Sequence, residues 1–430
     1  MTFYISTFGC KVNQYESEFI SELLLGLGYS KAKNLIDADI NIVNTCTVTS
    51  VADAKNRKII NKIKRENPSS VIVLCGCMPQ TIDYDSDSIY DKCNLIIGNN
   101  KLYRLPEILE KFFEDHINTV SVINHINNET FDKMSLSSFS ERTRAFVKIE
   151  DGCNQFCTYC TIPYARGRVR SKPLSDIVDE VKNLVSNSYN EIVLVGINLS
   201  CYGKDENHNI YDVVNEMSKI DGIERIRLGS IEPERLTRDI LFKLSEIKEF
   251  CPQFHLSLQS GCDNTLKHMK RHYLTNEYRE IVDNIRSCFD NPSITTDVMV
   301  GFSGETDEDF NDSLEFVKEI KFAKIHIFPY SRRKGTIAYN FDNIVSDEIK
   351  KVRCNKMNEV AQKSREEFLN SQIGTIASVL FERKTDSLTN SGYSKNYTPV
   401  IVQSKEDLTG KILNVNITGF EDDFCIGELC

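Results

Sequence analysis

The 430-residue chain carries 52 Lys and Arg against 62 Asp and Glu, a formal net charge of −10, which argues against a generally basic surface for nucleic acid. Its length predicts two or three domains instead of a single core. No apolar run approaches the length of a membrane span and the N-terminal residues do not resemble a signal peptide, so we expect a cytoplasmic protein without membrane contacts. In that compartment, 15 cysteines favour metal binding or catalysis over disulfides.

The first predicted domain covers residues 1–128 and alternates short β-branched runs with stretches of helical spacing. This alternation predicts an open parallel sheet with helices on both faces. The predicted strands are 3–8, 39–45, 70–76 and 94–98, and the clearest helical stretches are 14–27 and 52–65. A polar, Ser- and Asn-rich stretch at 124–142 then predicts an interdomain connector on the surface.

Three cysteines of this domain, Cys10, Cys46 and Cys77, each follow the C-terminal end of a predicted strand. These ends share one edge of a parallel sheet, so the three thiols are expected to converge there. Three thiolates can hold an iron–sulfur cluster and leave one iron open. A lone cysteine near a strand end is more often a packing residue, and Cys75 and Cys93 are assigned to the core.

The second predicted domain, residues 143–371, contains six strand-like runs separated by helical segments. Repeated βα units predict a full or partial (β/α) barrel, whose chemistry lies on loops at the C-terminal mouth. The runs are 145–150, 191–196, 224–229, 254–258, 294–300 and 324–328, and a connecting helix is expected over 347–369.

The loop after the first of these strands holds Cys153, Cys157 and Cys160 at the spacing C-x3-C-x2-C. Three soft thiolates within eight residues can bind three irons of a cluster. No fourth cysteine follows nearby, so one iron stays open for a ligand that is not protein.

Several further residues are expected at the same mouth, and for the polar ones barrel-mouth hydrogen bonding and cofactor contact are equal interpretations. They are Gly196, Asn198, Glu232, Gln259 and Phe328. A set of arginines flanks the cysteine loop and the last strand, and either forms a solvated basic edge or contacts RNA phosphates. This set is Arg166, Arg168, Arg170, Arg332 and Arg333.

Residues 372–430 contain short strand-like runs at 377–382, 398–403 and 411–420, which predict a small β-barrel. Tyr393 and Tyr397 could stack on a base, although tyrosines in a small barrel are more often packing residues.

The C-x3-C-x2-C loop with Tyr159 and the run Thr161-Ile162-Pro163-Tyr164-Ala165-Arg166-Gly167 resembles the methylthiotransferase branch of the radical S-adenosylmethionine (SAM) enzymes. The segments 9–17, 44–49 and 76–80 are similar to the N-terminal domain of that branch. Lys11-Val12-Asn13-Gln14, Ser230–Glu234 and Tyr330–Thr336 resemble the subgroup that acts on N6-threonylcarbamoyladenosine in tRNA, and Gly392–Tyr397 resembles the RNA-binding TRAM domain.

The resemblance implies an open barrel of six units and two [4Fe–4S] clusters, one on Cys153, Cys157 and Cys160 and an auxiliary one on Cys10, Cys46 and Cys77. It implies SAM near Tyr159, Gly196 and Asn198, and a methylthio transfer to adenosine 37 in the tRNA anticodon loop. An electron donor such as flavodoxin or ferredoxin and a sulfur source are then required. Two alternatives remain: the same chemistry on isopentenyladenosine 37 or a ribosomal-protein aspartate, and a non-catalytic cluster protein that binds RNA or senses redox state.

Overall fold

The computed structural model describes residues 1–81, 87–126, 129–139, 143–204 and 208–430. The first unit is a parallel six-stranded sheet in the order β2-β1-β3-β4-β5-β6. All four predicted strands of this unit are present, and β2 and β6 extend the two edges. The strands are β1 (Thr2–Thr7), β2 (Ser30–Lys31), β3 (Ile40–Thr45), β4 (Val71–Gly76), β5 (Leu95–Ile97) and β6 (Thr119–Ser121).

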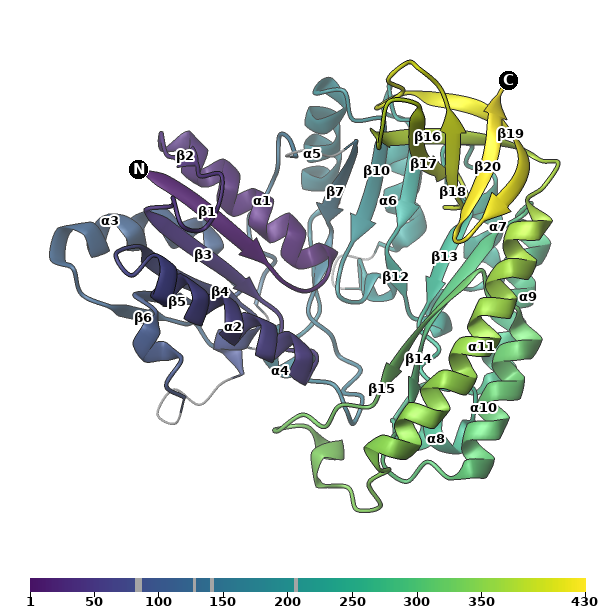
Figure 1. The fold of residues 1–430 in the computed structure, drawn as a ribbon, viewed down its shortest axis with the longest axis horizontal. Coiled ribbons are helices and arrows are strands. Elements are labelled where there is room, and N and C mark those ends of the chain that lie inside the picture. The colour runs from purple at the N-terminus through teal and green to yellow at the C-terminus, as the bar shows by residue number, and fades with distance from the viewer. Residues whose placement is uncertain (82–86, 127–128, 140–142, 205–207) are drawn as a thin grey trace.

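Helices cover both faces of this sheet, as predicted. They are α1 (Lys11–Gly26), α2 (Ser50–Glu66) and α3 (Leu105–Asp115), with short 3-10 turns η1 (Met78–Gln80), η2 (Tyr90–Lys92) and η3 (Leu102–Arg104). The α1 and α3 side chains share one buried core with the central domain, whereas α2 packs on a separate cluster with β3 and β4. Helix α1 therefore lies between the first sheet and the central domain (Figure 1).

The six predicted strands of the central domain form a partial parallel barrel. They are β7 (Arg144–Lys148), β10 (Glu191–Val195), β11 (Arg225–Leu228), β13 (Gln253–Leu256), β14 (Ser293–Val300) and β15 (Lys324–Pro329). Hydrogen bonding divides them into the sheets β7-β10-β11 and β12-β13-β14-β15, where β12 is Ser230–Ile231. The strands β8 (Glu150–Asp151) and β9 (Arg170–Ser171) pair antiparallel, and the cysteine loop connects them.

The helices of this domain are α4 (Ile162–Ala165), α5 (Leu174–Ser186), α6 (Ile210–Ser218), α7 (Arg238–Ser245), α8 (Asp263–His268), α9 (Thr275–Cys288), α10 (Asp307–Ile320) and α11 (Asp347–Ser371), with the turns η4 (Leu199–Cys201), η5 (Pro233–Arg235) and η6 (Ile337–Asn340). The longer helices line the outside of the barrel, whereas α4 lies in the cysteine loop beside η1 of the first domain (Figure 1). The expected connecting helix is α11, which packs against β15 and leads into the C-terminal unit. No helix in the described ranges has the length and apolar character needed to cross a membrane.

The C-terminal unit is a closed five-stranded barrel in the order β16-β17-β18-β20-β19. Its strands are β16 (Ile376–Lys384), β17 (Thr389–Ser394), β18 (Pro399–Gln403), β19 (Ile412–Glu421) and β20 (Phe424–Leu429). Arg225 and Ser293, the first residues of β11 and β14, hydrogen-bond to the backbone of Tyr393 and Asn396. The small barrel therefore packs against the N-terminal ends of the central strands, at the opposite end from the cysteine loop (Figure 1).

The connector expected at 124–142 is not simply a surface segment. Residues 127–128 and 140–142, which include the predicted domain boundary at 128, lie outside the described residues. In the described part, Met134, Leu136 and Phe139 are buried in the core shared by α1 and the central domain. Serines lie between these three residues in the sequence, so the polar composition of the segment gave no sign that it has buried apolar side chains. The predicted domain boundaries remain predictions.

Candidate active site

The central cysteine loop leaves the barrel after β8, and a glycine permits its tight path. Gly152 has a φ of +83°, and a Cβ at this position would lie 2.0 Å from the carbonyl oxygen of Arg168. Cys160 N–H donates to the Cys157 carbonyl at 3.0 Å, which closes a turn within the loop. Burial and then the neighbouring thiols of Cys157 and Cys160 raise the pKa of Cys153, so the structure brings the three thiols close together.

Two side chains from other loops donate hydrogen bonds to these sulfurs. Asn198 Nδ2 lies 3.7 Å from Cys153 Sγ, and Arg271 donates to Cys157 Sγ at 3.4 Å. Burial raises the pKa of the Cys160 thiol to about 12, and also raises the pKa values of Cys153 and Cys157. Metal binding would therefore have to displace the thiol protons, after which Asn198 and Arg271 could stabilise the thiolates.

Beside this loop lies a group of buried oxygen atoms without hydrogen-bond partners. Among the described residues, Glu150 Oε1 and Asn198 Oδ1 are buried and accept no hydrogen bond, while Glu150 Oε2 accepts from the Asn198 N–H at 2.7 Å. A Cβ on Gly196 would lie 2.8 Å from that same Glu150 oxygen, so the missing side chain leaves room there. Unsatisfied acceptors beside a cluster loop match the donors of an ammonium group, such as that of SAM.

The other predicted cofactor contacts also lie around this mouth. Tyr159 is half-buried and packs edge-on against Phe302, with ring centroids 6.2 Å apart. Glu232 is ion-paired with Arg271, the same guanidinium that contacts Cys157. Phe328 at the end of β15 is 46% exposed, which leaves its ring available to pack against a ligand.

Gln259 follows β13 with a left-handed backbone, φ +65°. Its N–H donates to the Asp297 carbonyl, and its own carbonyl accepts from the Met299 N–H. The backbone of Gln259 thus joins β13 to β14 at the mouth, and no contact with a cofactor is needed to explain its conformation.

The first-domain cysteines lie together at the C-terminal edge of the first sheet. A Cβ on Gly9, whose φ is +109°, would lie 2.9 Å from Cys46 Cβ, so the loops of Cys10 and Cys46 touch. Cys10 Sγ lies 3.4 Å from Asn13 Oδ1, and the Cys77 N–H donates to the Thr45 carbonyl at 3.0 Å. Each loop is therefore fixed to the end of β3 or to α1.

The two cysteine sets have the donor chemistry of iron–sulfur sites. Among the described residues, no three His, Cys, Asp or Glu side chains converge on one point where a single metal ion could sit. An iron–sulfur cluster binds each thiolate at a different iron, so its ligands surround it without meeting at one point. Three grouped thiols with hydrogen-bond donors beside them fit such a cluster.

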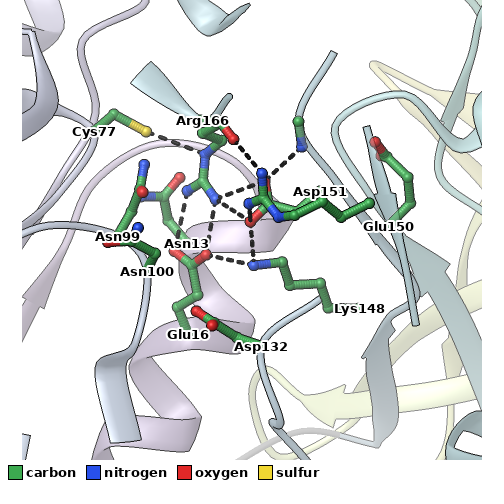
Figure 2. A network of polar contacts seen from close by, with 12 residues as sticks. Asn13, Glu16, Cys77, Asn99, Asn100, Asp132, Lys148, Glu150, Asp151 and Arg166 are labelled. Carbon is green, nitrogen blue, oxygen red and sulfur yellow. Dashed lines mark hydrogen bonds and ion pairs between the residues drawn. The ribbon is translucent and has the colours of Figure 1, made fainter. Parts of the chain in front are cut away.

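A buried ion-pair network joins the two cysteine sets (Figure 2). Arg166, at the end of α4, is fully buried and contacts Glu16 of α1, Asp151 of β8 and the sulfur of Cys77. Lys148 Nζ lies 2.8 Å from Glu16 and 2.6 Å from Asp151. Because cations hold Asp151 in this network, the pKa of its carboxyl lies below the usual range despite burial.

This network corrects part of the predicted RNA surface. Arg166 and Arg170 are 0% and 5% exposed and use their guanidinium groups inside the protein, so neither presents a charge to RNA phosphates. The alternating spacing suggested a solvated edge, but the buried carboxylates that draw two of these arginines inward lie elsewhere in the sequence. Arg168, between them, is exposed and stacks on Phe156 at 4.4 Å.

Of the two remaining arginines predicted to contact RNA, one is exposed and the other forms contacts within the protein. Arg332 is exposed and lies 4.7 Å from the Tyr339 ring centroid. Arg333 instead crosses to the first domain, where it contacts Asp53 at 2.5 Å and Thr47 at 2.9 Å. It therefore links the barrel mouth to the first domain and is not a free phosphate ligand.

The sequence suggested that Tyr393 and Tyr397 could stack on a base, but in the structure the two rings do not present free faces for this. Their rings stack on each other, with centroids 4.4 Å apart and planes 14° apart. Arg144 lies 5.2 Å and 5.1 Å from the two ring centroids, and Arg227 lies 4.7 Å from that of Tyr397. The pair therefore helps to fix the small barrel to the central domain.

Sequence reasoning missed four residues that shape the site: Asn13, Glu16, Lys148 and Arg271. Asn13 and Glu16 lie within the first cysteine motif, and Lys148 lies five residues before Cys153. Their closeness to cysteines was the available signal. Arg271 lies 114 residues from Cys157, and no spacing rule links the two.

Comparison with known proteins identifies the family of this chain. The profile of the Radical SAM superfamily matches residues 147–317, and that of "Uncharacterized protein family UPF0004" matches residues 2–98. A tRNA-2-methylthio-N(6)-dimethylallyladenosine synthase of Clostridium beijerinckii is 36% identical over 99% of this chain and 95% of its own length. The threonylcarbamoyladenosine tRNA methylthiotransferase MtaB of Bacillus subtilis is 33% identical over 96% of this chain and 92% of its own length.

The chain belongs to the radical SAM tRNA methylthiotransferase family. As a member of the radical SAM superfamily, this methylthiotransferase uses SAM and a [4Fe–4S] cluster. A further similar protein, the MtaB of Chlamydia pneumoniae, is 34% identical over 100% of this chain and 98% of its own length.

Solved structures share the fold of this methylthiotransferase at low identity. The radical SAM methyltransferase TsrM of Kitasatospora setae aligns over 76% of this chain and 74% of its own, with a TM-score of 0.57 and 13% identity. The cobalamin-dependent SAM radical enzyme OxsB aligns over 84% of this chain and 56% of its own, with a TM-score of 0.52 and 11% identity. At this identity the likeness concerns fold only, and it confirms the predicted radical SAM architecture.

Proposed function

We propose that this methylthiotransferase converts N6-threonylcarbamoyladenosine at position 37 of tRNA to its 2-methylthio derivative, using two [4Fe–4S] clusters. The observation that carries the proposal is the pairing of two cysteine sets through Arg166, which contacts Cys77 and also Asp151, two residues before Cys153. Two cluster-binding edges connected by one side chain suit a reaction in which one cluster starts the radical chemistry and the other supplies the group to be transferred.

Cys153, Cys157 and Cys160 would hold the cluster that binds SAM, and Cys10, Cys46 and Cys77 would hold the auxiliary cluster. When bound, these groups supply the one-electron chemistry that cleaves SAM and the methylthio group that is transferred. The chain itself orients the cofactor. Glu150 and Asn198 offer acceptors for the SAM ammonium group, and Phe328 offers an exposed ring for the adenine.

The tRNA partner is supported by the names of the relatives and by the mouth surface. Arg168 and Arg332 are exposed beside the cysteine loop and after β15, where they could contact phosphates of an anticodon loop. In an acidic chain, such local cations carry the electrostatic attraction for RNA. The reaction also requires an electron donor such as flavodoxin or ferredoxin, and a sulfur source.

The choice of threonylcarbamoyladenosine rests on Lys11-Val12-Asn13-Gln14 and on the two relatives named MtaB. Its side group ends in a carboxylate, for which Arg168 and Arg332 offer complementary charge. Dimethylallyladenosine is the second candidate substrate, since the Clostridium relatives carry that name. The mouth also has apolar residues suited to it: Val48 and Val51 are 50% and 61% exposed beside Cys46.

The decisive experiment is nucleoside mass spectrometry of tRNA from a deletion strain and from the same strain complemented with the gene. We expect deletion to remove 2-methylthio-N6-threonylcarbamoyladenosine and to leave the methylthiolated isopentenyl nucleosides intact. Loss of the isopentenyl form alone would assign the second substrate. Unchanged levels of both nucleosides would contradict the tRNA proposal.

A further inference from the structure

Arg166 makes one contact that its role in a buried ion-pair network does not require. Its Nη1 and Nη2 contact the two carboxylate oxygens of Glu16 at 2.8 Å and 3.0 Å, which fixes the guanidinium plane. Its Nε–H then points at Cys77 Sγ at 3.2 Å (Figure 2). A bidentate carboxylate thus aims the remaining donor at a sulfur atom.

The surroundings leave this guanidinium no alternative position. Arg166 and Glu16 are both 0% exposed. Asp151 accepts from Arg166 Nη1 at 3.2 Å, and the carbonyl of Arg166 accepts from Arg170 at 2.8 Å. The side chain and the backbone of Arg166 are therefore held from three elements: α1, β8 and β9.

The atom that Arg166 Nε–H contacts is the sulfur of a proposed cluster ligand, Cys77. A neutral thiol gains little from a buried guanidinium, whereas a cluster-bound thiolate gains a charge-assisted hydrogen bond. Donors to ligand sulfurs stabilise the added electron and raise the reduction potential of an iron–sulfur cluster. The same guanidinium contacts Asp151, which precedes Cys153 by two residues.

We propose that Arg166 is a positioning residue for Cys77, and that its Nε–H raises the reduction potential of the auxiliary cluster while its other nitrogens fix that cluster relative to the loop of Cys153. The inference rests on the auxiliary cluster of the proposed function. Arg166 acts through Cys77 and Asp151 and does not contact substrate.

The test uses the full-length protein with Cys153→Ala, Cys157→Ala and Cys160→Ala, so that only the auxiliary cluster contributes iron and an electron paramagnetic resonance signal. Arg166→Lys is added to this background, since lysine keeps the charge but cannot reproduce the fixed fork of donors. Arg170→Lys is the matched control. It makes the same exchange in the same buried network, and the guanidinium of Arg170 contacts the oxygens of Arg166, Arg168, Glu129 and Asp151.

In a potentiometric titration, we expect Arg166→Lys to lower the equilibrium constant for reduction by up to about tenfold, which is about 59 mV for a one-electron couple. Arg170→Lys should leave it near the parent value. Loss of iron from Arg166→Lys with iron retained in Arg170→Lys would also support the positioning role. Equal potentials in all three proteins, or equal effects of the two arginine variants, would overturn the inference.

The parent protein of this series separates that result from a failure of the proposed function. If the protein with the three alanines binds no cluster after anaerobic reconstitution, the auxiliary site itself is refuted. If it binds about four irons but its potential does not respond to Arg166→Lys, only the role of Arg166 is refuted.

Discussion

Arg227 Nε lies 3.0 Å from Glu191 Oε1 where the small C-terminal barrel meets the central domain. Arg225 and Arg144 approach the same carboxylate at 3.3 Å and 3.7 Å, and these three cations lower the pKa of Glu191 in spite of its burial. The arginines also reach the backbone or side chains of the small barrel. One buried carboxylate therefore holds the interface between two units.

Glu191→Gln should destabilise the protein by about 3–5 kcal/mol, because it leaves buried cations without a counter-charge. The midpoint of chemical denaturation, followed by circular dichroism, measures this change. Lys243→Ala is the control: it removes a cation from an exposed pair on α7 and should change stability by less than about 1 kcal/mol. Equal effects of the two changes would contradict the role of Glu191.

Cys157→Ala should abolish reductive cleavage of SAM, because the change removes one of the three thiolates of the SAM-binding cluster. The measurement is the formation of 5′-deoxyadenosine by anaerobically reconstituted protein. Cys251→Ala is a matched control, since Cys251 is a buried cysteine outside both trios. Full cleavage activity in Cys157→Ala would refute the ligand assignment.

Cys46→Ala should separate the two proposed clusters functionally. We expect SAM cleavage to continue, because its cluster is held by other cysteines, while methylthiolated tRNA is no longer formed. Both products can be measured in one reaction by mass spectrometry. Retained methylthio product would show that Cys46 is not needed for sulfur transfer.

Arg168→Ala and Arg332→Ala should each weaken tRNA binding in a salt-dependent way. Loss of one phosphate contact to single-stranded RNA lowers the slope of log affinity against log salt by about 0.7. Filter binding between low and high salt gives this slope. Lys243→Ala again serves as control, and unchanged slopes in both arginine variants would place the RNA elsewhere on the surface.

Burial raises the pKa of Glu150 to about 8. Between the ordinary carboxyl range and pH 8, the unfolded chain is ionised here while the folded apoprotein holds a proton, so stability falls as pH rises. The slope is at most about 1.4 kcal/mol per pH unit. Apoprotein with Glu150→Gln should lack this component, and unfolding curves from pH 5 to pH 8 should therefore diverge from those of the parent. Parallel curves would contradict the raised pKa.

Strand and helix periodicity predicted the three units and the positions of the main central strands, because these elements bury continuous β-branched runs. It missed β17 and β20, whose segments Thr389–Ser394 and Phe424–Leu429 mix polar residues with glycine. These strands are stabilised by pairing with β16, β18 and β19, which only tertiary structure supplies.

The candidate site was predictable to a similar extent. Local spacing indicated the set of Cys153, Cys157 and Cys160, and placement after the ends of predicted strands indicated the set of Cys10, Cys46 and Cys77. Neither signal could show which arginines are buried: Glu16 lies 150 residues from Arg166, and the ion pair between them exists only once α1 packs against the central domain. Arg144 and Arg227, which cover the rings of Tyr393 and Tyr397, are also distant in the sequence, so the stacked pair could not be distinguished from an open aromatic platform.

The core that α1 shares with the central domain has a consequence for substrate entry. Separating the two cysteine edges would expose a continuous apolar surface and break the buried pairs around Arg166. The relative placement of the two cysteine edges is thus set when the chain folds, not when RNA arrives. A target base would therefore have to leave the stack of its own loop to reach edges whose placement is already fixed, and the conformational cost of catalysis would fall on the RNA.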